Sequence, residues 1–309
     1  MSYKKTPPAF DKSLLWPQHW PSWFLVGLLK VIALMPLAFS LCLGRGLGLL
    51  LYRCAGQRRA IAEVNIALCF PQLNSSEQAA VVKESIISVG ITFFEAGAAL
   101  WGQADKFKGR HIIEGLEHIE KAQAEGRGAL LLGAHFTTID VAGRIVAYYQ
   151  RVDTVYRKHK NPVMAYQVTK ARDQFGDSIL RSDMGKLVKT LRRGNLAWYA
   201  PDQDYGAKHS VFAPFFGQQA ATVTGSARIA KVSRAALLPF SHYRDERGHY
   251  RVVIKPALEN FPSGDDIADA TLVNQHIEAA IAECPEQYLW VHRRFKTRPE
   301  GEQRPYKKS

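Results

Sequence analysis

A histidine and an aspartate stand five positions apart, directly after an apolar run. Residues 133–140 read GAHFTTID, which places Asp140 at the spacing H-x4-D from His135. Positions i and i+5 of one regular helix do not share a face, because about 3.6 residues complete a turn. If His135 lies in a strand-to-helix turn and Asp140 in the first turns of that helix, the carboxylate can reach the imidazole. Such a pair performs general-base chemistry, since the carboxylate fixes the tautomer while the other ring nitrogen accepts a proton.

The H-x4-D spacing alone is a weak signal, because a histidine of this kind is more often part of a protein core. Metal binding is the less favoured alternative, since no second His or Cys stands at ligand spacing. No Ser or Cys stands in a nucleophile-elbow context, so the sequence offers no nucleophile for a covalent intermediate. The sequence carries no cofactor motif. We therefore predict no metal and no organic cofactor.

Further polar residues follow other apolar runs. Residues 156–162 read YRKHKNP, and Arg157 ends a strand-like run where it can contact a substrate phosphate or a thioester; the alternative is a surface cation. Lys160 and Asn161 in the same segment are candidate substrate-binding residues. A reaction that builds negative charge on a substrate oxygen needs hydrogen-bond donors, and Arg157 or backbone N–H groups near Gly133 are the candidates.

Two aspartates stand in the segment PDQDYG at 201–206. Asp202 and Asp204 have two interpretations: caps of the turn before Gly206, which is the commoner role, or members of the site. The basic C-terminal stretch holds Arg293 and Arg294, which suit either a solvated tail or docking onto phosphates or an acidic protein. The phenylalanines within VFAPFFG (211–217) are more often core than the wall of an acyl-chain tunnel, although such a tunnel needs apolar lining.

The elements that must position these residues form an alternating pattern. GALLLG at 128–133 is an apolar run bounded by glycines, typical of a buried parallel strand. Strand-like runs recur at 152–156, 196–200, 236–243 and 250–255. Helical patterns at 163–174, 186–193 and 224–233 separate most of them, and others cover 77–100, the segment after Thr137, and 267–283. This alternation predicts an α/β fold with a largely parallel or mixed sheet flanked by helices.

Composition and charge narrow the class of protein. The chain of 309 residues is 47% hydrophobic and 22% charged, which is ordinary for a globular protein. Its 41 Lys+Arg against 28 Asp+Glu give a net charge of +13, which favours polyanionic partners: nucleic acid, an anionic membrane or an acidic protein. Four scattered cysteines with no C-x-x-C pattern indicate a reducing compartment.

The N-terminal region predicts a membrane anchor. Residues 23–43 are 21 residues with one charge, Lys30, and a helix of this length reaches roughly 30 Å. Pro36 would kink this helix without excluding a span. An in-plane amphipathic helix or a core helix are the alternatives, so the anchor is single-pass or monotopic. Basic residues flank it on both sides, with the larger cluster following, which favours a cytoplasmic main domain. We divide the chain into an anchor at 1–55 and a catalytic domain at 56–309.

Taken together, these segments resemble the late acyltransferases of lipid A biosynthesis. PDQDYG, VFAPFFG and the C-terminal EQYLWVHRRFKTRPEG (286–301) are the specific parts, and the resemblance runs from the anchor nearly to the C-terminus. The tail is more similar to the lauroyl or palmitoleoyl transferases than to the myristoyl transferase. One departure is that those relatives usually carry Glu where this chain has Asp140.

The resemblance implies transfer of an acyl chain from acyl carrier protein to a hydroxyl of the Kdo2-tetraacyl lipid A precursor, Kdo2-lipid IVA. It implies a glycerolipid-acyltransferase-like fold, with His135, Asp140 and Arg157 as catalytic residues. It tilts Asp202 and Asp204 toward the site. The location would be the bacterial inner membrane, facing the cytoplasm. A lysophospholipid acyltransferase is the nearest alternative, although its glycine-rich block is absent. A non-catalytic basic protein binding membrane or nucleic acid is the alternative from another class, but no nucleic-acid module appears.

Overall fold

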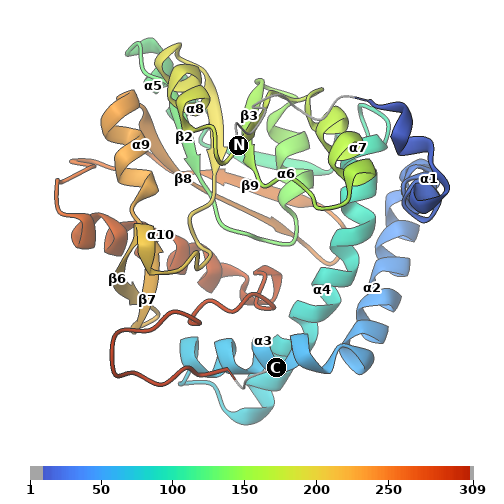
Figure 1. Cartoon of the computed structure of the whole chain (residues 1–309), viewed down its shortest axis with the longest axis horizontal. Helices are drawn as coiled ribbons and strands as arrows, with labels where there is room; N and C mark the ends of the chain where they lie inside the picture. The colour runs from blue at the N-terminus through green and yellow to red at the C-terminus, as the bar shows by residue number, and fades with distance from the viewer. Residues whose placement is uncertain (1–9, 307–309) are drawn as a thin grey trace.

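A computed structural model of the chain describes residues 10–306, and its centre is a mixed sheet of seven strands (Figure 1). The strand order is β1-β9-β8-β2-β5-β3-β4. The strands are β1 (His111–Glu114), β2 (Ala129–Leu132), β3 (Val152–Tyr156), β4 (Ser178–Leu180), β5 (Leu196–Tyr199), β8 (Ala236–Arg244) and β9 (Tyr250–Ile254). Neighbours pair in parallel except β8 with β9. The predicted α/β class with a mixed sheet flanked by helices is confirmed.

Helices cover both faces of the sheet, because the central strand β2 is buried on both sides. Leu130 and Leu132 of β2 belong to one apolar cluster, with residues of α8, α9 and α10, and Ala129 and Leu131 to another, with residues of α5 and α6. The α-helices that follow residue 55 are α3 (Gly56–Cys69), α4 (Ser75–Trp101), α5 (Leu116–Ala124), α6 (Ile139–Val146), α7 (Pro162–Arg172), α8 (Met184–Arg192), α9 (Gly225–Ser233) and α10 (Asp266–Glu283).

Local signals explain where the longest helix begins. The Asn74 side chain accepts the backbone N–H groups of Ser76 and Glu77, and Glu77 returns a bond to the N–H of Asn74. This capping box satisfies N–H groups that the first helical turn leaves without partners. It fixes the start of α4, which then runs along the molecule and carries Leu100 to the wall of the pocket described below.

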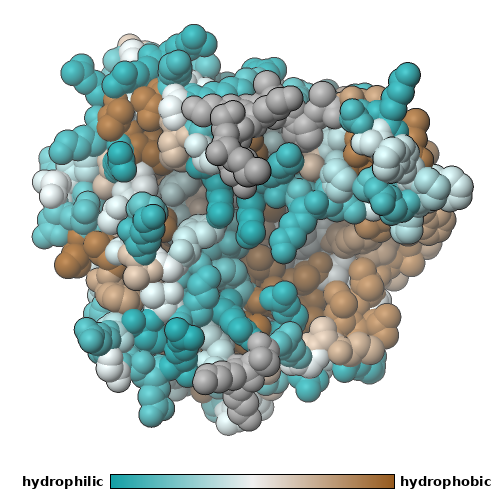
Figure 2. Space-filling model, viewed as in Figure 1, coloured by the Kyte–Doolittle hydropathy of each residue, from teal (hydrophilic) through white to brown (hydrophobic). Residues whose placement is uncertain are grey.

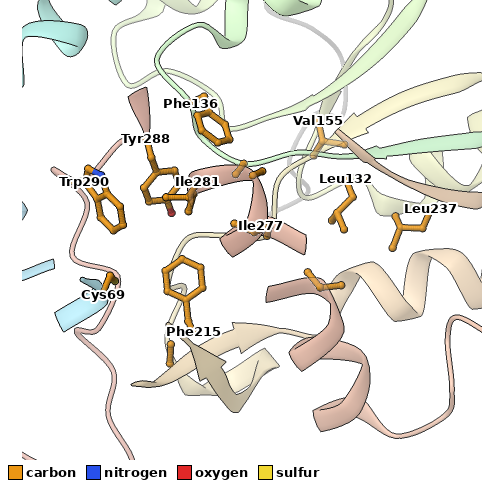
Figure 3. Close-up of a cluster of buried hydrophobic side chains, with 14 of the residues drawn as sticks. Cys69, Leu132, Phe136, Val155, Phe215, Leu237, Ile277, Ile281, Tyr288 and Trp290 are labelled. Carbon is orange, nitrogen blue, oxygen red and sulfur yellow. The ribbon is translucent and has the colours of Figure 1, made fainter. Parts of the chain in front are cut away.

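The sequence did not predict several short elements as strands. The four-residue β1 and three-residue β4 are too short to show an alternation. VFAPFFG belongs to a separate hairpin of β6 (Ser210–Phe215) and β7 (Gln218–Val223), which pair antiparallel. Phe215 is fully buried in the core, and Figure 3 shows it near Cys69 and Trp290. The core interpretation of this phenylalanine therefore holds.

The N-terminal apolar segment forms two helices instead of the expected single one. α1 (Trp20–Leu34) and α2 (Leu37–Cys54) meet at Met35 and Pro36, because Pro36 cannot continue the hydrogen bonding of α1. The Lys106 ammonium binds the backbone carbonyls of Ala33, at 2.7 Å, and of Met35, so the break is held in place. Within residues 10–306, α2 is the one helix long and apolar enough to cross a membrane by length and composition.

The C-terminal segment returns to the sheet and fastens the loop that carries His135. Thr137 N–H donates to the Gln287 carbonyl at 2.8 Å, and Leu289 N–H donates to the His135 carbonyl at 3.0 Å. Asn65 of α3 holds the next turn through the carbonyls of Trp290 and His292. The EQYLW stretch therefore has a structural role, because its backbone hydrogen bonds hold the loop that carries His135.

Candidate active site

The candidate residues gather because their strands are neighbours. β2, β5 and β3 lie side by side and run parallel, so their carboxyl ends share one edge of the sheet. His135 follows β2, Asp202 follows β5 and Arg157 follows β3. The carboxyl edge of a parallel sheet is where α/β folds bind ligands. Arg181 follows β4, the next strand in the same order, and extends the series.

Asp202 is the carboxylate that holds His135. Its Oδ1 lies 2.6 Å from His135 Nδ1, and its Oδ2 accepts the His135 backbone N–H at 3.0 Å. The Tyr288 hydroxyl donates to the same Oδ2 at 2.9 Å. Asp202 is buried, whereas the His135 side chain is about a quarter exposed, at 27%. With Nδ1 engaged by the carboxylate, Nε2 is the nitrogen available to a substrate proton.

The two partners shift each other's protonation. Burial would by itself lower the pKa of His135, but the charge of Asp202 and its hydrogen bond outweigh burial and place that pKa above its ordinary value. Burial would raise the pKa of Asp202, yet the His135 charge and three hydrogen bonds hold it well below the usual range. The site therefore stabilises the imidazolium that general-base catalysis produces.

Asp140, predicted to orient His135, instead forms an ion pair with Arg172. Arg172 Nη2 donates to Asp140 Oδ1 at 2.6 Å, and both side chains are mostly buried. Asp140 sits in the first turn of α6, as expected, but the position at Nδ1 of His135 is taken by Asp202 from the neighbouring strand. Spacing along the chain could not reveal a partner 67 residues away. Asp140 nevertheless lines the same pocket as His135.

A pocket of about 1200 Å³ opens at this edge. Its apolar wall includes Leu100, Leu131, Val146, Val152, Phe175 and Phe240. Its charged side chains are six cations, Arg157, Arg172, Arg181, Lys189, Arg192 and Arg228, and one carboxylate, Asp140. A pocket with this lining suits an amphiphilic molecule that carries both acyl chains and anionic groups.

The segment after β3 is divided between the pocket and a helix cap. Arg157 and His159 line the pocket and are exposed. Asn161 accepts the Met164 N–H at 3.1 Å as the N-cap of α7, and its amide donates to Ser22 Oγ at 2.6 Å. Both ends of this predicted substrate-binding amide thus contact the protein. Lys160 is exposed on the same loop.

Asp204 and Arg294 have structural contacts. Asp204 is buried and accepts the Gly206 N–H at 2.8 Å, as well as the backbone N–H and hydroxyl of Thr297. The Arg294 guanidinium, 1% exposed, donates to the Ala221 carbonyl and to Thr222 and packs over the Phe215 ring. The expected surface position of Arg294 is therefore corrected to an interior one. Arg293 remains partly exposed.

The structure narrows the choice of oxyanion donors. The backbone N–H of Gly133 donates to the Tyr199 carbonyl at 3.0 Å, and that of Phe136 donates to Ala134 at 2.9 Å. The His135 N–H is bound by Asp202. These three groups near Gly133 are engaged within the protein, whereas Arg157 is exposed and lines the pocket, so Arg157 stays a candidate donor.

Two contributors were missed from the sequence. Tyr288 lies in EQYLWVHRRF, where it has no chemical motif around it, and only the folded C-terminus brings its hydroxyl to Asp202. Figure 3 shows its ring beside Trp290 and Phe136. Arg181 follows a strand too short to be recognised, and its guanidinium packs over the Tyr205 ring at 5.1 Å. The signal available was a basic residue directly after β4, as Arg157 stands directly after β3.

The site combines a hydrogen-bonded His–Asp pair, an apolar pocket and a basic rim on an α/β sheet, which together are suited to base-assisted group transfer with an amphiphilic substrate. Comparison of the sequence with known families identifies the class further: residues 7–297 match the family described as bacterial lipid A biosynthesis acyltransferase. The chain belongs to this family of acyltransferases.

Curated relatives agree across almost the whole chain. The lipid A biosynthesis lauroyltransferase of Escherichia coli (strain K12) is 38% identical over 95% of this chain and 97% of its own length. The lipid A biosynthesis palmitoleoyltransferase of the same organism is 35% identical, over 96% and 98%. Its lipid A biosynthesis myristoyltransferase is 30% identical, over 97% and 94%. The resemblance inferred from PDQDYG, VFAPFFG and the C-terminal stretch is confirmed.

Proposed function

We propose that this acyltransferase moves a fatty acyl chain from acyl carrier protein to a hydroxyl of the Kdo2-tetraacyl lipid A precursor. The observation that carries the proposal is the His135–Asp202 hydrogen bond, with His135 lining a pocket that has an apolar wall and a basic rim. The family and its relatives supply the acceptor class. The carrier protein fits because it is acidic and this chain carries a net charge of +13.

The proposed reaction is direct transfer with His135 as the general base. Nε2 accepts the proton of the acceptor hydroxyl while the hydroxyl oxygen forms a bond to the thioester carbonyl carbon. The tetrahedral oxyanion faces Arg157. When the carbon–sulfur bond breaks, the leaving thiolate takes the proton back from Nε2. Asp202 stays ionised throughout and stabilises the transient imidazolium.

The basic rim is proposed to hold the phosphates and sugar carboxylates of the acceptor. Arg181 and Arg228 line the rim from different elements, β4 and α9, and guanidinium groups bind such anions through paired hydrogen bonds. Lys160 and Arg293, both on the surface, remain proposed as outer contacts for substrate or carrier protein. Asp204 and Arg294 act indirectly, by fixing the C-terminal segment.

The apolar depth is proposed to receive the acyl chain. Asp140 and Gly143 lie one turn apart on α6 and both line the pocket, and outside the adjoining backbone of α6 no atom stands within 4 Å of where a Cβ of Gly143 would be. A glycine inside a helix costs about 1 kcal/mol relative to alanine. Its presence here leaves open space along the apolar wall for a methylene chain.

We place the enzyme at the bacterial inner membrane with its catalytic part, residues 56–309, facing the cytoplasm. The apolar N-terminal helices support a membrane location, and the acyl donor is a cytoplasmic protein in this proposal. A lysophospholipid acceptor would use the same base. The pocket is lined by six cations against one carboxylate, and this excess of positive charge favours the more highly charged lipid A precursor.

An acyl-transfer assay in detergent tests the proposal. Purified protein receives Kdo2-lipid IVA and acyl-carrier-protein thioesters of several chain lengths, and mass spectrometry detects the gain of one acyl chain. His135→Ala should reduce the rate by about 10²–10⁴-fold, the usual contribution of a general base. Transfer to a lysophospholipid but not to Kdo2-lipid IVA would replace the acceptor, and full activity in His135→Ala would refute the base.

A further inference from the structure

The N-terminal helices lie across each other instead of forming one rod. In Figure 1, α1 is seen nearly end-on at the right, whereas α2 runs down the right side next to α4. α1 has 15 residues, which is about 22 Å at ~1.5 Å per residue and shorter than the ~20 residues that span a bilayer. Because Pro36 separates them, the two helices cannot combine into one straight crossing.

α2 is fixed to the catalytic part along its length. An added Cβ on Gly44 would stand 2.6 Å from the Ile91 backbone, and one on Gly48 would stand 2.5 Å from the Ile87 backbone of α4. Gly90 of α4 completes this close contact, since its Cβ would meet Gly48 at 2.3 Å. α4 begins with a polar capped turn and its other side packs in the core. Inserting α2 across a bilayer would therefore carry α4 into the lipid with it.

The outer sides of both helices form a continuous apolar surface. On α1, Val26, Leu29 and Ile32 are buried against the protein, and the opposite arc is exposed. The exposed large apolar side chains of this region are Leu15, Trp16, Trp20, Phe24, Leu28, Val31, Leu34, Phe39, Leu43 and Leu50. Figure 2 shows apolar residues gathering on the side of the molecule where α2 lies. Soluble surfaces rarely expose such a patch unless something covers it.

The charges around this surface select an anionic partner. Residues 12–54 contain Lys12, Lys30, Arg45 and Arg53 and no acidic residue. At about 100° per residue, Lys30 falls beside the exposed apolar arc of α1, where its ammonium can reach a headgroup layer. The exposed loop 157–160 adds Arg157, Lys158 and Lys160.

The loop 157–160 is joined directly to α1. Asn161 donates to Ser22 Oγ at 2.6 Å, and Val26 of α1 packs with Val163 of α7 and Leu14 in one buried cluster. Since Arg157 and His159 also line the pocket, this loop connects the apolar surface to the pocket rim.

We propose that α1 and α2 lie in the plane of an anionic lipid leaflet without crossing it, and that the loop 157–160 contacts its headgroups. The apolar side chains enter the boundary between headgroups and acyl chains, as in-plane amphipathic helices do. With α1 and α2 lying in the leaflet in this way, the pocket rim is at the depth of the lipid phosphates. The inference rests on the proposed membrane location but is independent of the proposed reaction.

Vesicle flotation of the full chain tests the lipid surface. Phe24→Asp and Val31→Asp should each lower partition to phosphatidylcholine–phosphatidylglycerol vesicles about tenfold or more, which corresponds to ~1.4 kcal/mol. The control Ile267→Asp changes an equally exposed apolar residue on α10, 55% exposed, and should bind like wild type. If all three variants bound the vesicles equally, the proposal that the apolar side of α1 contacts lipid would be refuted.

The same assay tests the loop. Lys158→Glu with Lys160→Glu should reduce binding to anionic vesicles several-fold and leave binding to pure phosphatidylcholine vesicles unchanged. Lys121→Glu with Lys231→Glu is the control, because it makes the same change of charge at exposed positions on α5 and α9. A loss on both vesicle types, or an equal loss in the control, would refute a specific headgroup contact.

Depth measurements separate an in-plane helix from a crossing one. Single cysteines at Phe24, Leu28 and Val31, in a background with Cys42→Ser and Cys54→Ser, carry a fluorophore quenched by lipids labelled at known depths. An in-plane α1 gives one shallow depth, whereas a crossing helix gives a change of about 10 Å over seven residues. A change of depth along α1 would refute the in-plane arrangement but keep the membrane location. No binding to vesicles at all would refute both the arrangement and the location. Neither result depends on acyl transfer.

Discussion

The inner half of the site and its outer rim are built differently. Asp202 is buried and its carboxylate accepts hydrogen bonds from His135 and Tyr288, which the core holds in turn. Along the rim, Arg157, Arg181 and Arg228 are exposed on separate elements. The inner half can fix one proton-accepting geometry, whereas the rim can adjust to a large charged acceptor. In the proposed function, proton transfer belongs to the inner half and acceptor binding to the rim, and Arg157 lies where the two meet.

The largest effect should come from the inner half. Asp202→Asn should lower kcat by about 10²–10⁴-fold, because the imidazolium loses its counter-charge and the tautomer is no longer fixed. The neutral imidazole is the active form, so the rate of the wild type rises with pH through the raised pKa of His135. Without the Asp202 charge, burial lowers that pKa, and the acid limb of the pH–rate profile should move to lower pH.

Asp204→Asn is the matched control for this change. It alters a second buried aspartate of the same loop, whose contacts are with Gly206 and Thr297. It should lower the melting temperature and leave the acid limb unshifted. If Asp202→Asn and Asp204→Asn shifted the acid limb of the pH–rate profile equally, the pairing of His135 with Asp202 would not determine the pKa of the base.

The next effect should come from the residue where the two halves meet. Arg157→Gln should reduce kcat by about a hundredfold if its guanidinium faces the oxyanion. Arg151→Gln provides the control, because Arg151 is exposed at the other end of β3 and pairs with Asp177 at 2.8 Å. Steady-state kinetics separates the roles: a rise in KM alone, growing with salt, would assign Arg157 to the rim.

A smaller effect is expected at Asp140. Asp140→Asn leaves the mostly buried Arg172 guanidinium without its charged partner and should lower the free energy of unfolding by about 1–3 kcal/mol. His135 keeps Asp202, so the acid limb should stay in place. Asp177→Asn, which breaks the exposed pairs with Arg151 and Lys186, should cost less stability and leave the acid limb in place. A shifted limb in Asp140→Asn would restore the H-x4-D pairing expected from the sequence.

The sequence was informative wherever a pattern is local. The run GALLLG predicted β2, and Val152–Tyr156 matched β3 at both ends, because burial of a parallel strand leaves a continuous apolar run. His135, Asp202 and Arg157 could be proposed because each follows such a run. Their order across the sheet could not, since strand order is decided by non-local packing.

The predictions that the structure corrects depend on packing between residues that are distant in the sequence, or on the exact effect of a proline. Asp140 was favoured as the partner of His135 because it is close in sequence, but the neighbouring strand brings Asp202 closer. Arg294 was placed on the surface because it stands in a run of charged residues; burial between β7 and Phe215 overrides that expectation. The sequence also predicted one helix kinked at Pro36, whereas the structure has a full break there between α1 and α2, because proline cannot continue the helical hydrogen bonding.

The smallest effect tests how tightly the inner half is built. Tyr288→Phe removes one donor from Asp202, whose Oδ2 keeps the backbone N–H of His135. We expect kcat to fall only a few-fold and stability by about 1 kcal/mol, the usual net value of a hydrogen bond. Tyr243→Phe, which loses an equally buried bond to the Ala280 carbonyl at 2.8 Å, should match the stability loss and keep full activity. Equal kinetics in the two variants would mean that Asp202 needs only His135 to stay ionised, and the inner half would then reduce to a dyad.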